Sequence, residues 1–272
     1  MNTLILKKGR EKSLKRRHPW IFSGAIERVI GTPKAGDTVE VHSAEGAPLA
    51  IAAYSPSSQI RARVWSFDAK ATANAEYFNR KVKQAVALRD ALPLAKHTNA
   101  LRLVHGESDG LPGLIVDRYA DVLAVQFLSA GAERWREAIL DALVQATRCE
   151  AVFERSDAEV RKLEGLEPRV GFARGDRNAS RCPITEYGLH FRVDVAQGQK
   201  TGFFLDQREN RQRVRALAAG REVLDGFCYT GGFAIAALAG GGRKRARGGE
   251  LRAGAGGRAG ESVCELARRV ES

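Results

Sequence analysis

Residues 222–238 read EVLDGFCYTGGFAIAAL, and this stretch decides the fold. An apolar strand from Glu222 runs into a loop containing Gly231 and Gly232, and an alanine-rich helix follows at once. Strand, glycine loop and helix in this order form the first unit of a doubly wound α/β domain, where a nucleotide-like ligand binds at the loop. Glycines let the backbone approach the ligand, and the helix N-terminus offers it free N–H groups. The sequence therefore predicts a Rossmann-like domain that begins near Val223.

The glycine spacing of this loop bears on the ligand. It does not follow the Gly-x-Gly-x-x-Gly pattern of dinucleotide-binding folds, so the carboxylate of a methionine moiety fits better than a pyrophosphate. A nicotinamide-dependent oxidoreductase is therefore disfavoured. The motif alone leaves open a tight turn between strand and helix that binds nothing.

The charge of the chain indicates a polyanionic partner. Its 272 residues include 44 Lys and Arg against 32 Asp and Glu, a net charge of +12 at pH 7. Such surfaces usually bind polyanions, although a merely basic soluble protein is the alternative. No apolar run approaches the roughly 18 residues of a membrane span, and no signal peptide is recognisable, so we expect a cytoplasmic protein. The four cysteines lack metal-site spacing, which predicts neither metal nor disulfides.

The densest basic segment covers residues 7–18, KKGREKSLKRRH, and runs directly into Pro19-Trp20-Ile21-Phe22. Cations contact phosphates and aromatic rings stack on bases, so this combination predicts an RNA-binding surface. The candidate RNA-binding residues are Arg10, Lys12, Lys15, Arg16, Arg17 and Trp20. The alternative is a solvated basic helix, with Trp20 and Phe22 as core residues.

The rest of the chain shows two further patterns. Alternating segments at 38–41, 49–54 and 60–65 indicate a small β-barrel or sandwich. Arg61 and Arg63 share one face of their strand and are expected in solvent; the alternative is that they add to the basic surface. Helical and strand patterns then alternate and predict a separate α/β domain; the helices are expected at 73–92 and 132–147, and the strands at 101–104, 113–118, 122–127 and 151–154. Residues 171–182 are expected to form an exposed loop, followed by a strand at 189–195 and a helix at 208–219.

Several segments together resemble one known family. They are GREKSL (9–14), RHPWIFSG (17–24), AYSPSSQIR (53–61), GESDGLPG (106–113), KTGFFLDQR (200–208) and FCYTGGFA (227–234). Over about residues 4–240 the chain resembles the bacterial 23S ribosomal RNA cytosine-5 methyltransferase I family. The resemblance implies a PUA-like β-barrel at 1–72, a central α/β domain at 73–188 and the N-terminal part of a Rossmann-like methyltransferase domain at 189–240.

The resemblance also implies the ligands and their sites. Ribosomal RNA would be the partner and S-adenosyl-L-methionine the cofactor, while the oligomeric state stays open. The residues expected at the methyl donor are Lys200, Thr201, Asp206, Arg208, Phe227, Tyr229, Gly231 and Gly232. Two of them have alternatives, since Asp206 could cap the helix that follows and Arg208 could pair with an acidic neighbour on it. The GESDGLPG turn needs no functional explanation and is left out of the site.

The sequence changes character after Gly240. Gly, Ala and Arg make up 20 of the 32 residues from 241 to 272, so we expect an irregular, disordered tail without a buried strand. Glu250 lies near the spacing of a ribose-binding carboxylate, but its neighbours do not form a buried strand. A frameshift in a GC-rich gene is one hypothesis, and a naturally short RNA-binding protein is the rival.

The acceptor chemistry is the part that the sequence lacks. Members of the family are thought to add a cysteine thiolate to C6 of cytosine, methylate C5 and remove its proton with a base. The Asp-Pro-Pro-Lys-like and Ser-Cys-Ser-like segments for this do not occur, and Cys228 and Cys264 have the wrong surroundings. We therefore name no catalytic residue and expect an impaired enzyme; the alternative is a non-catalytic RNA-binding protein derived from the family.

Overall fold

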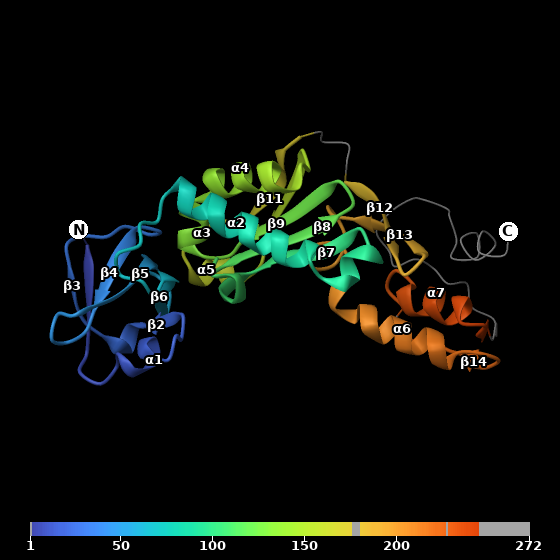
Figure 1. Ribbon diagram of the computed structural model, residues 1–272, viewed down its shortest axis with the longest axis horizontal. Coiled ribbons are helices and arrows are strands. Elements are labelled where there is room, and N and C mark those ends of the chain that lie inside the picture. Colours follow the sequence, from blue (N-terminus) through green and yellow to red (C-terminus); the bar gives the residue numbers. More distant parts are fainter. Residues whose placement is uncertain (1, 176–179, 227, 245–272) are drawn as a thin grey trace. The chain divides into compact units, whose positions relative to one another are not determined.

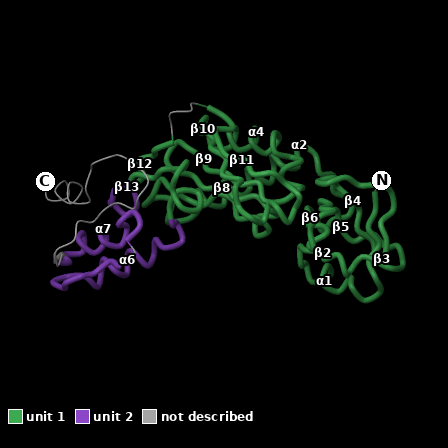
Figure 2. The backbone as a smooth tube through the Cα atoms, turned by 180° about the vertical axis from the view of Figure 1, so that it is seen from behind, with its two compact units in different colours: residues 1–184, 192–203 green, residues 185–191, 204–272 purple. Residues whose placement is uncertain are grey.

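The computed structural model describes residues 2–175, 180–226 and 228–244 (Figure 1). The chain divides into two compact units, which Figure 2 shows in different colours. Unit 1 contains residues 1–184 and 192–203, and unit 2 contains residues 185–191 and 204–272. The tail predicted at 241–272 lies outside the described residues from 245 onward, and Glu250 lies there too.

Unit 1 begins with a six-stranded sheet in the order β2-β6-β5-β4-β1-β3. Its strands are β1 (Thr3–Leu6), β2 (Trp20–Phe22), β3 (Ile26–Ile30), β4 (Thr38–His42), β5 (Pro48–Tyr54) and β6 (Ile60–Ser66). The strands predicted at 38–41, 49–54 and 60–65 are therefore confirmed. Every second residue is buried in β4, because alternate side chains of a strand face one core. The short helix α1 (Lys12–Lys15) adds Leu14 to that core.

The second sheet of unit 1 has five strands in the order β11-β10-β9-β8-β7. They are β7 (Ala100–His105), β8 (Leu114–Tyr119), β9 (Val122–Phe127), β10 (Ala151–Ser156) and β11 (Arg169–Arg174). The helices α2 (Ala75–Asp90) and α4 (Arg136–Thr147) pack together and against this sheet (Figure 1). Asn74 caps α2, because its side chain accepts a hydrogen bond from the N–H of Tyr77 at 2.8 Å. The predicted mixed α/β pattern of this part is confirmed.

Three local predictions in this region were wrong. The segment predicted as a loop at 171–182 contains part of β11, which pairs antiparallel with β10, and the start of β12 (Arg181–Glu186). The helix predicted at 132–147 is split, since α3 (Ala130–Arg134) ends before Trp135 and α4 begins after it. In the helix predicted at 73–92, helical spacing places Leu88 on the apolar side, but this side chain is 58% exposed.

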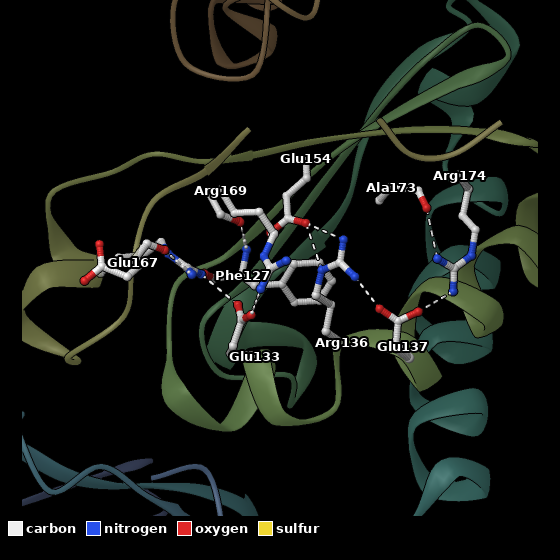
Figure 3. Close-up of polar contacts among 11 residues, drawn as sticks. Phe127, Glu133, Arg136, Glu137, Glu154, Glu167, Arg169, Ala173 and Arg174 are labelled. Atoms are coloured by element: carbon white, nitrogen blue, oxygen red, sulfur yellow. Dashed lines mark hydrogen bonds and ion pairs between the residues drawn. The ribbon is translucent and has the colours of Figure 1, made fainter. Parts of the chain in front are cut away.

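The arginines around β11 do not form an open basic surface, because carboxylates neutralise them (Figure 3). Arg136 donates to the buried carboxylate of Glu154 at 2.8 Å. Glu133 accepts from Arg161 at 2.9 Å and from Arg169 at 3.0 Å. These arginines are therefore paired with carboxylates within unit 1 and are not available to bind a ligand.

Unit 2 contains the predicted strand–loop–helix. Its helices are α6 (Arg208–Leu217) and α7 (Gly232–Ala239). The short strand β14 (Glu222–Val223) precedes α7 in the chain, β15 (Arg243–Lys244) follows it, and the two strands pair in parallel. A parallel strand–helix–strand unit is how a doubly wound domain starts. The strand β15 follows Gly240, but it spans only two residues and its Arg243 is exposed, so it is not the buried strand whose absence was expected. The apolar strand predicted from Glu222 is present as β14, which spans only two residues, and Leu224 directly after it is 92% exposed.

The strand predicted at 189–195 is present as β13 (Leu189–Asp194), which pairs with β12 in a two-stranded sheet. Alternation along the predicted strand places Leu189, Phe191, Val193 and Val195 on its inward side, and each is at most 6% exposed. Fold class is thus confirmed as α/β in several parts, with a small β domain in front. The exact domain boundaries stay predictions. No helix in the described part of the chain is long and apolar enough to cross a membrane.

Candidate functional site

The predicted RNA-binding residues lie together on one short stretch of unit 1. They belong to α1, the turns that flank it and the first residue of β2, and all six are exposed. Within the part of the chain that the structure describes, no carboxylate forms an ion pair with Arg10, Lys12, Lys15, Arg16 or Arg17. These cations are therefore available to phosphates, unlike the arginines around β11.

Trp20 and Phe22, on the short strand β2, are 37% and 48% exposed. Their backbone pairs antiparallel with β6, and Ile21 between them points into the core because alternate side chains face opposite sides. The alternative of Trp20 and Phe22 as core residues was therefore wrong. A hollow of about 230 Å³ lies between α1 and β2, beside these two rings.

Arg63 corrects the expectation that it stays in solvent. It is 7% exposed and forms ion pairs with Glu164 at 3.0 Å and with Glu107 at 3.3 Å. Burial alone would raise the pKa of Glu164, but the Ser55 hydroxyl, which donates to it at 2.6 Å, and the charge of Arg63 outweigh burial and hold the pKa below 4.5. A buried carboxylate paired in this way stays ionised at neutral pH. The ion pairs join the six-stranded sheet to the α/β part of unit 1.

The predicted donor loop lies in unit 2, between β14 and α7. Tyr229 and Gly231 have positive φ angles of 47° and 75°, and Gly231 is the N-cap of α7. The carboxylate of Asp225 accepts from the N–H of Ala234 at 3.1 Å. The N–H groups of Gly232 and Phe233 donate to no described protein atom, so the helix start offers two donors to a carboxylate. Phe227 lies outside the described residues.

Two of the predicted donor-site residues, Lys200 and Thr201, belong to unit 1. Lys200 has a positive φ of 54°, and Thr201 is 1% exposed. The Thr201 hydroxyl donates to the carboxylate of Asp117 at 2.5 Å and lies 2.9 Å from the hydroxyl of Tyr119. Burial, and after it the charge of Asp117, raise the pKa of Tyr119 well above its ordinary value, so this hydroxyl stays protonated. Thr201 is thus anchored to β8 by its side chain.

Asp206 and Arg208 belong to unit 2. The cap position of α6 is Gln207, and Asp206 precedes it in the short 3₁₀ helix η4 (Leu205–Gln207). Arg208 pairs with an acidic residue outside its own helix, since its Nε donates to Glu186 of β12 at 3.0 Å. The same buried carboxylate accepts two hydrogen bonds from Arg211, both at 2.7 Å.

The structure fits the expected donor at one place that it describes in full. The two free N–H groups at the start of α7 suit the carboxylate of S-adenosyl-L-methionine, and the Tyr229 ring, 38% exposed, offers a planar face beside them. The Tyr229 ring stands edge-on to Phe204 at 5.6 Å between centroids. No group of three or more potential metal ligands occurs among the described residues.

Sequence reasoning missed several acidic residues that hold these sites together. They are Glu107, Asp117, Glu164, Glu186 and Asp225. Their partners are 9 to 109 residues away in the chain, so no local pattern marks them. For Glu107 a signal existed, because it lies in the GESDGLPG segment that was set aside as a turn.

Two family models match the chain. Residues 4–67 match a PUA-like domain, and residues 171–256 match an S-adenosylmethionine-dependent methyltransferase. Ribosomal RNA large subunit methyltransferase I of Erwinia tasmaniensis is 51% identical over 237 residues, which cover 87% of this chain and 60% of that protein. The same protein of Serratia proteamaculans is 50% identical over 238 residues, covering 88% and 60%. The chain thus spans about 60% of the length of the curated relatives it matches.

Solved structures agree on the fold. A protein of Streptococcus mutans, described as a SAM-dependent methyltransferase, superposes with a TM-score of 0.72 and covers 89% of this chain and 61% of that one. A second methyltransferase structure, solved in complex with SAH, has a TM-score of 0.73 with the same coverage. Both are 24% identical to this chain, so they show a shared fold.

The matches and the fold define the class of this protein, which joins a PUA-like domain to an S-adenosylmethionine-dependent methyltransferase fold. More narrowly, the chain belongs to the family of the bacterial ribosomal RNA large subunit methyltransferase I proteins. The family resemblance drawn from the sequence is therefore confirmed.

Proposed function

We propose that this chain derives from an S-adenosyl-L-methionine-dependent methyltransferase that forms 5-methylcytosine in 23S ribosomal RNA, and that it retains the RNA-binding and donor-binding parts. The observation that carries the proposal is the start of α7, where Gly231 has a positive φ and two N–H groups are free in the family's donor loop. The unpaired cations of α1 and the identity to the ribosomal RNA methyltransferases support RNA as the substrate class.

The proposed site follows from the same residues. In unit 2 the loop with Tyr229, Gly231 and Gly232 would hold the methionine part of the donor, and Arg208 would lie near it, fixed by Glu186. Lys200 and Thr201, which belong to unit 1, are proposed as donor-binding residues from the family resemblance alone, and the Thr201 side chain is anchored to β8. Phe227 and Asp206 complete the proposed set. The donor supplies the methyl group, while these residues bind and orient it.

Methyl transfer by residues 1–272 alone is proposed to be impaired. Cytosine C5 is a poor nucleophile and needs a cysteine thiolate at C6 together with a base. The sequence holds no Ser-Cys-Ser-like or Asp-Pro-Pro-Lys-like segment for those roles. We propose a cytoplasmic location, where ribosomal RNA is found.

Isothermal calorimetry with S-adenosylhomocysteine tests the donor-binding part. We expect binding that NAD does not reproduce and that Gly232→Asp removes, because a carboxylate at the helix start repels the donor carboxylate. Gly220→Asp, on an exposed turn of the same unit, is the matched control. Binding of NAD in place of the donor analogue would contradict the proposal.

A binding-only protein is the second candidate, because the cations of α1 are exposed whether or not a donor binds. Incubating the purified chain with labelled donor and 23S ribosomal RNA separates the two. We expect RNA binding with at most trace incorporation of label. Incorporation at the rate of an intact enzyme would contradict the proposed impairment, and donor binding without any RNA binding would contradict the RNA assignment.

A further inference from the structure

We infer that the hollow between α1 and β2 binds one unpaired RNA base, and that Glu107 is a positioning residue that holds Trp20 for stacking on it. The inference rests on the proposed function, since it takes RNA as the ligand. It extends the proposed function by naming the hollow that binds the base and a residue, Glu107, that lies outside the basic segment.

The hollow has the size and lining for a single base. Its volume of about 230 Å³ lies below the roughly 300 Å³ at which pockets for drug-sized ligands begin, so it suits a base and not a whole cofactor. Its lining combines apolar and polar groups: Arg10, Ser13, Leu14, Trp20, Phe22 and Gly24. A splayed base needs this combination of apolar walls and hydrogen-bonding groups.

The two aromatic rings at the hollow give the strongest indication of stacking. Trp20 and Phe22 are 37% and 48% exposed, in a domain whose other large apolar side chains mostly fill its core. Their rings are nearly perpendicular, with an interplanar angle of 83° and centroids 6.3 Å apart. Exposed rings beside unpaired cations are typical of surfaces that bind single strands, where each base stacks on an aromatic face.

The positive charge around the hollow favours RNA over an apolar peptide or a second copy of the chain as its ligand. Arg10 lines the hollow, and Lys12, Lys15 and Arg16 lie on or next to the same helix without a carboxylate within ion-pair distance among the described residues. These cations would meet the phosphates on either side of the bound base. An apolar peptide or a second copy of this basic chain would gain nothing from them.

Glu107 fixes the indole of Trp20 from outside the β domain. The Trp20 Nε1–H donates to Oε1 of Glu107 at 2.7 Å. Arg63, whose guanidinium lies 5.7 Å from the centre of the indole ring, also donates to Glu107, at 3.3 Å. An indole without these two contacts could rotate about its side-chain bonds, so Glu107 sets its plane.

The turn that carries Glu107 is itself held firmly. It forms the short 3₁₀ helix η3 (Gly106–Asp109), and Asp109 accepts hydrogen bonds from Arg89 at 2.5 and 2.8 Å. Asp109 also accepts from the N–H of His105 at 2.6 Å. The stacking ring is therefore ordered before RNA arrives, which lowers the entropy lost on binding.

The test measures binding of the full chain to a mixed-sequence single-stranded RNA and to a duplex of the same sequence, at two salt concentrations. We expect Trp20→Ala to weaken single-strand binding about tenfold or more, the usual effect of losing a base–aromatic stack. Glu107→Ala should weaken it several-fold, and Glu107→Gln should restore most of the affinity, because its amide oxygen still accepts from the indole. The salt slope should stay that of the wild type, since no phosphate contact is lost. Leu88→Ala, exposed on α2, is the matched control.

Fluorescence gives a second readout that a purely structural role would not move. Trp65 is 3% exposed and Trp135 is half-buried, so RNA that stacks on Trp20 should quench the emission of this exposed tryptophan. Quenching should fall in Glu107→Ala and return in Glu107→Gln. Trp20→Phe retains a ring and should bind more tightly than Trp20→Ala, which keeps the test valid if the alanine variant folds poorly.

The outcomes separate this inference from the proposed function. If the wild type binds RNA with a normal salt slope but Trp20→Ala and Glu107→Ala bind equally well, the base site is wrong and the proposed function stands. If the wild type binds no RNA, both are wrong. Equal weakening of single-strand and duplex binding by Trp20→Ala would also overturn the base site.

Discussion

Arg211 donates hydrogen bonds to both oxygens of the buried Glu186 carboxylate, one from its Nε and one from a terminal nitrogen, each at 2.7 Å. The two side chains are 2% and 0% exposed, and Arg208 adds a third hydrogen bond at 3.0 Å. One acid of β12 thus holds two cations of α6. The first turns of α6 are fixed to the hairpin that precedes them in the chain.

We predict that Glu186→Ala strongly destabilises unit 2. It would leave Arg208 and Arg211 buried without their carboxylate, a change that costs about 3–5 kcal/mol for a buried ion pair. Urea unfolding followed by circular dichroism measures the loss in free energy of unfolding. Glu209→Gln changes an exposed acid on the same helix and should have little effect. Equal stability of Glu186→Ala and Glu209→Gln would contradict the prediction.

The stability of unit 1 should depend on pH through Glu164. Its pKa is lower in the folded protein than the ordinary 4.5, so its ionised form stabilises the fold fully above pH 4.5. This stabilisation is lost as the pH falls through the lowered pKa of the folded state. We therefore expect Glu164→Gln to be less stable than the wild type at pH 7, and the difference to shrink below pH 4.5. Thermal unfolding between pH 3 and 7 measures it, with the exposed Glu159→Gln as the control.

Thr201→Val should destabilise unit 1 by about 1–3 kcal/mol, the usual cost of leaving a buried polar group without its partner. The change removes the hydroxyl that donates to Asp117 at 2.5 Å and keeps nearly the same shape. Chemical unfolding gives the difference, and Thr32→Val, at an exposed position, is the control. If the donor proposal holds, the affinity for S-adenosylhomocysteine should fall in Thr201→Val only. A stable variant with normal donor affinity would show that this anchor is dispensable.

Gly240→Ala should loosen the packing of α6 against α7. A Cβ at this position would lie 1.9 Å from the carbonyl oxygen of Arg215, so one helix must move. Overpacking of this kind typically costs about 1–3 kcal/mol. Gly226→Ala is the control in the same unit, because a Cβ there meets nothing within 4 Å. Protease sensitivity of α6 should rise in the first variant and stay unchanged in the second.

The sequence was sufficient where the local pattern also decides the tertiary surroundings. β4 and β9 follow their predicted segments because alternating or continuous apolar residues have one way to be buried. The loop at 229–232 lies where the positions of Gly231 and Gly232 predicted it. The basic patch is as exposed as predicted, because α1 buries only Leu14.

Two failures, at Arg63 and at residues 171–174, share a physical cause, which is that a distant partner decided the outcome. Arg63 looks like a surface cation on its strand, but ion pairs with Glu164, 101 residues later, and with Glu107, 44 residues later, make its burial affordable in free energy. Residues 171–174 look like a polar loop, but the free edge of β10 accepts them as a strand and the acids of α4 neutralise Arg174. No local pattern in a single sequence shows which distant residues will pair in this way.

The hydrogen bonds that anchor Thr201 and Phe203 to β8 cross 84 residues of chain. During synthesis on the ribosome, Asp117 and Tyr119 therefore emerge long before two of the groups that satisfy them. The sheet around β8 can form early, but its buried polar groups are completed only after the hairpin β12–β13 and residues 195–203 have been made. If the ribosome paused before residue 203, unit 1 would stay incompletely folded, with the Asp117 carboxylate and the Tyr119 hydroxyl exposed to water.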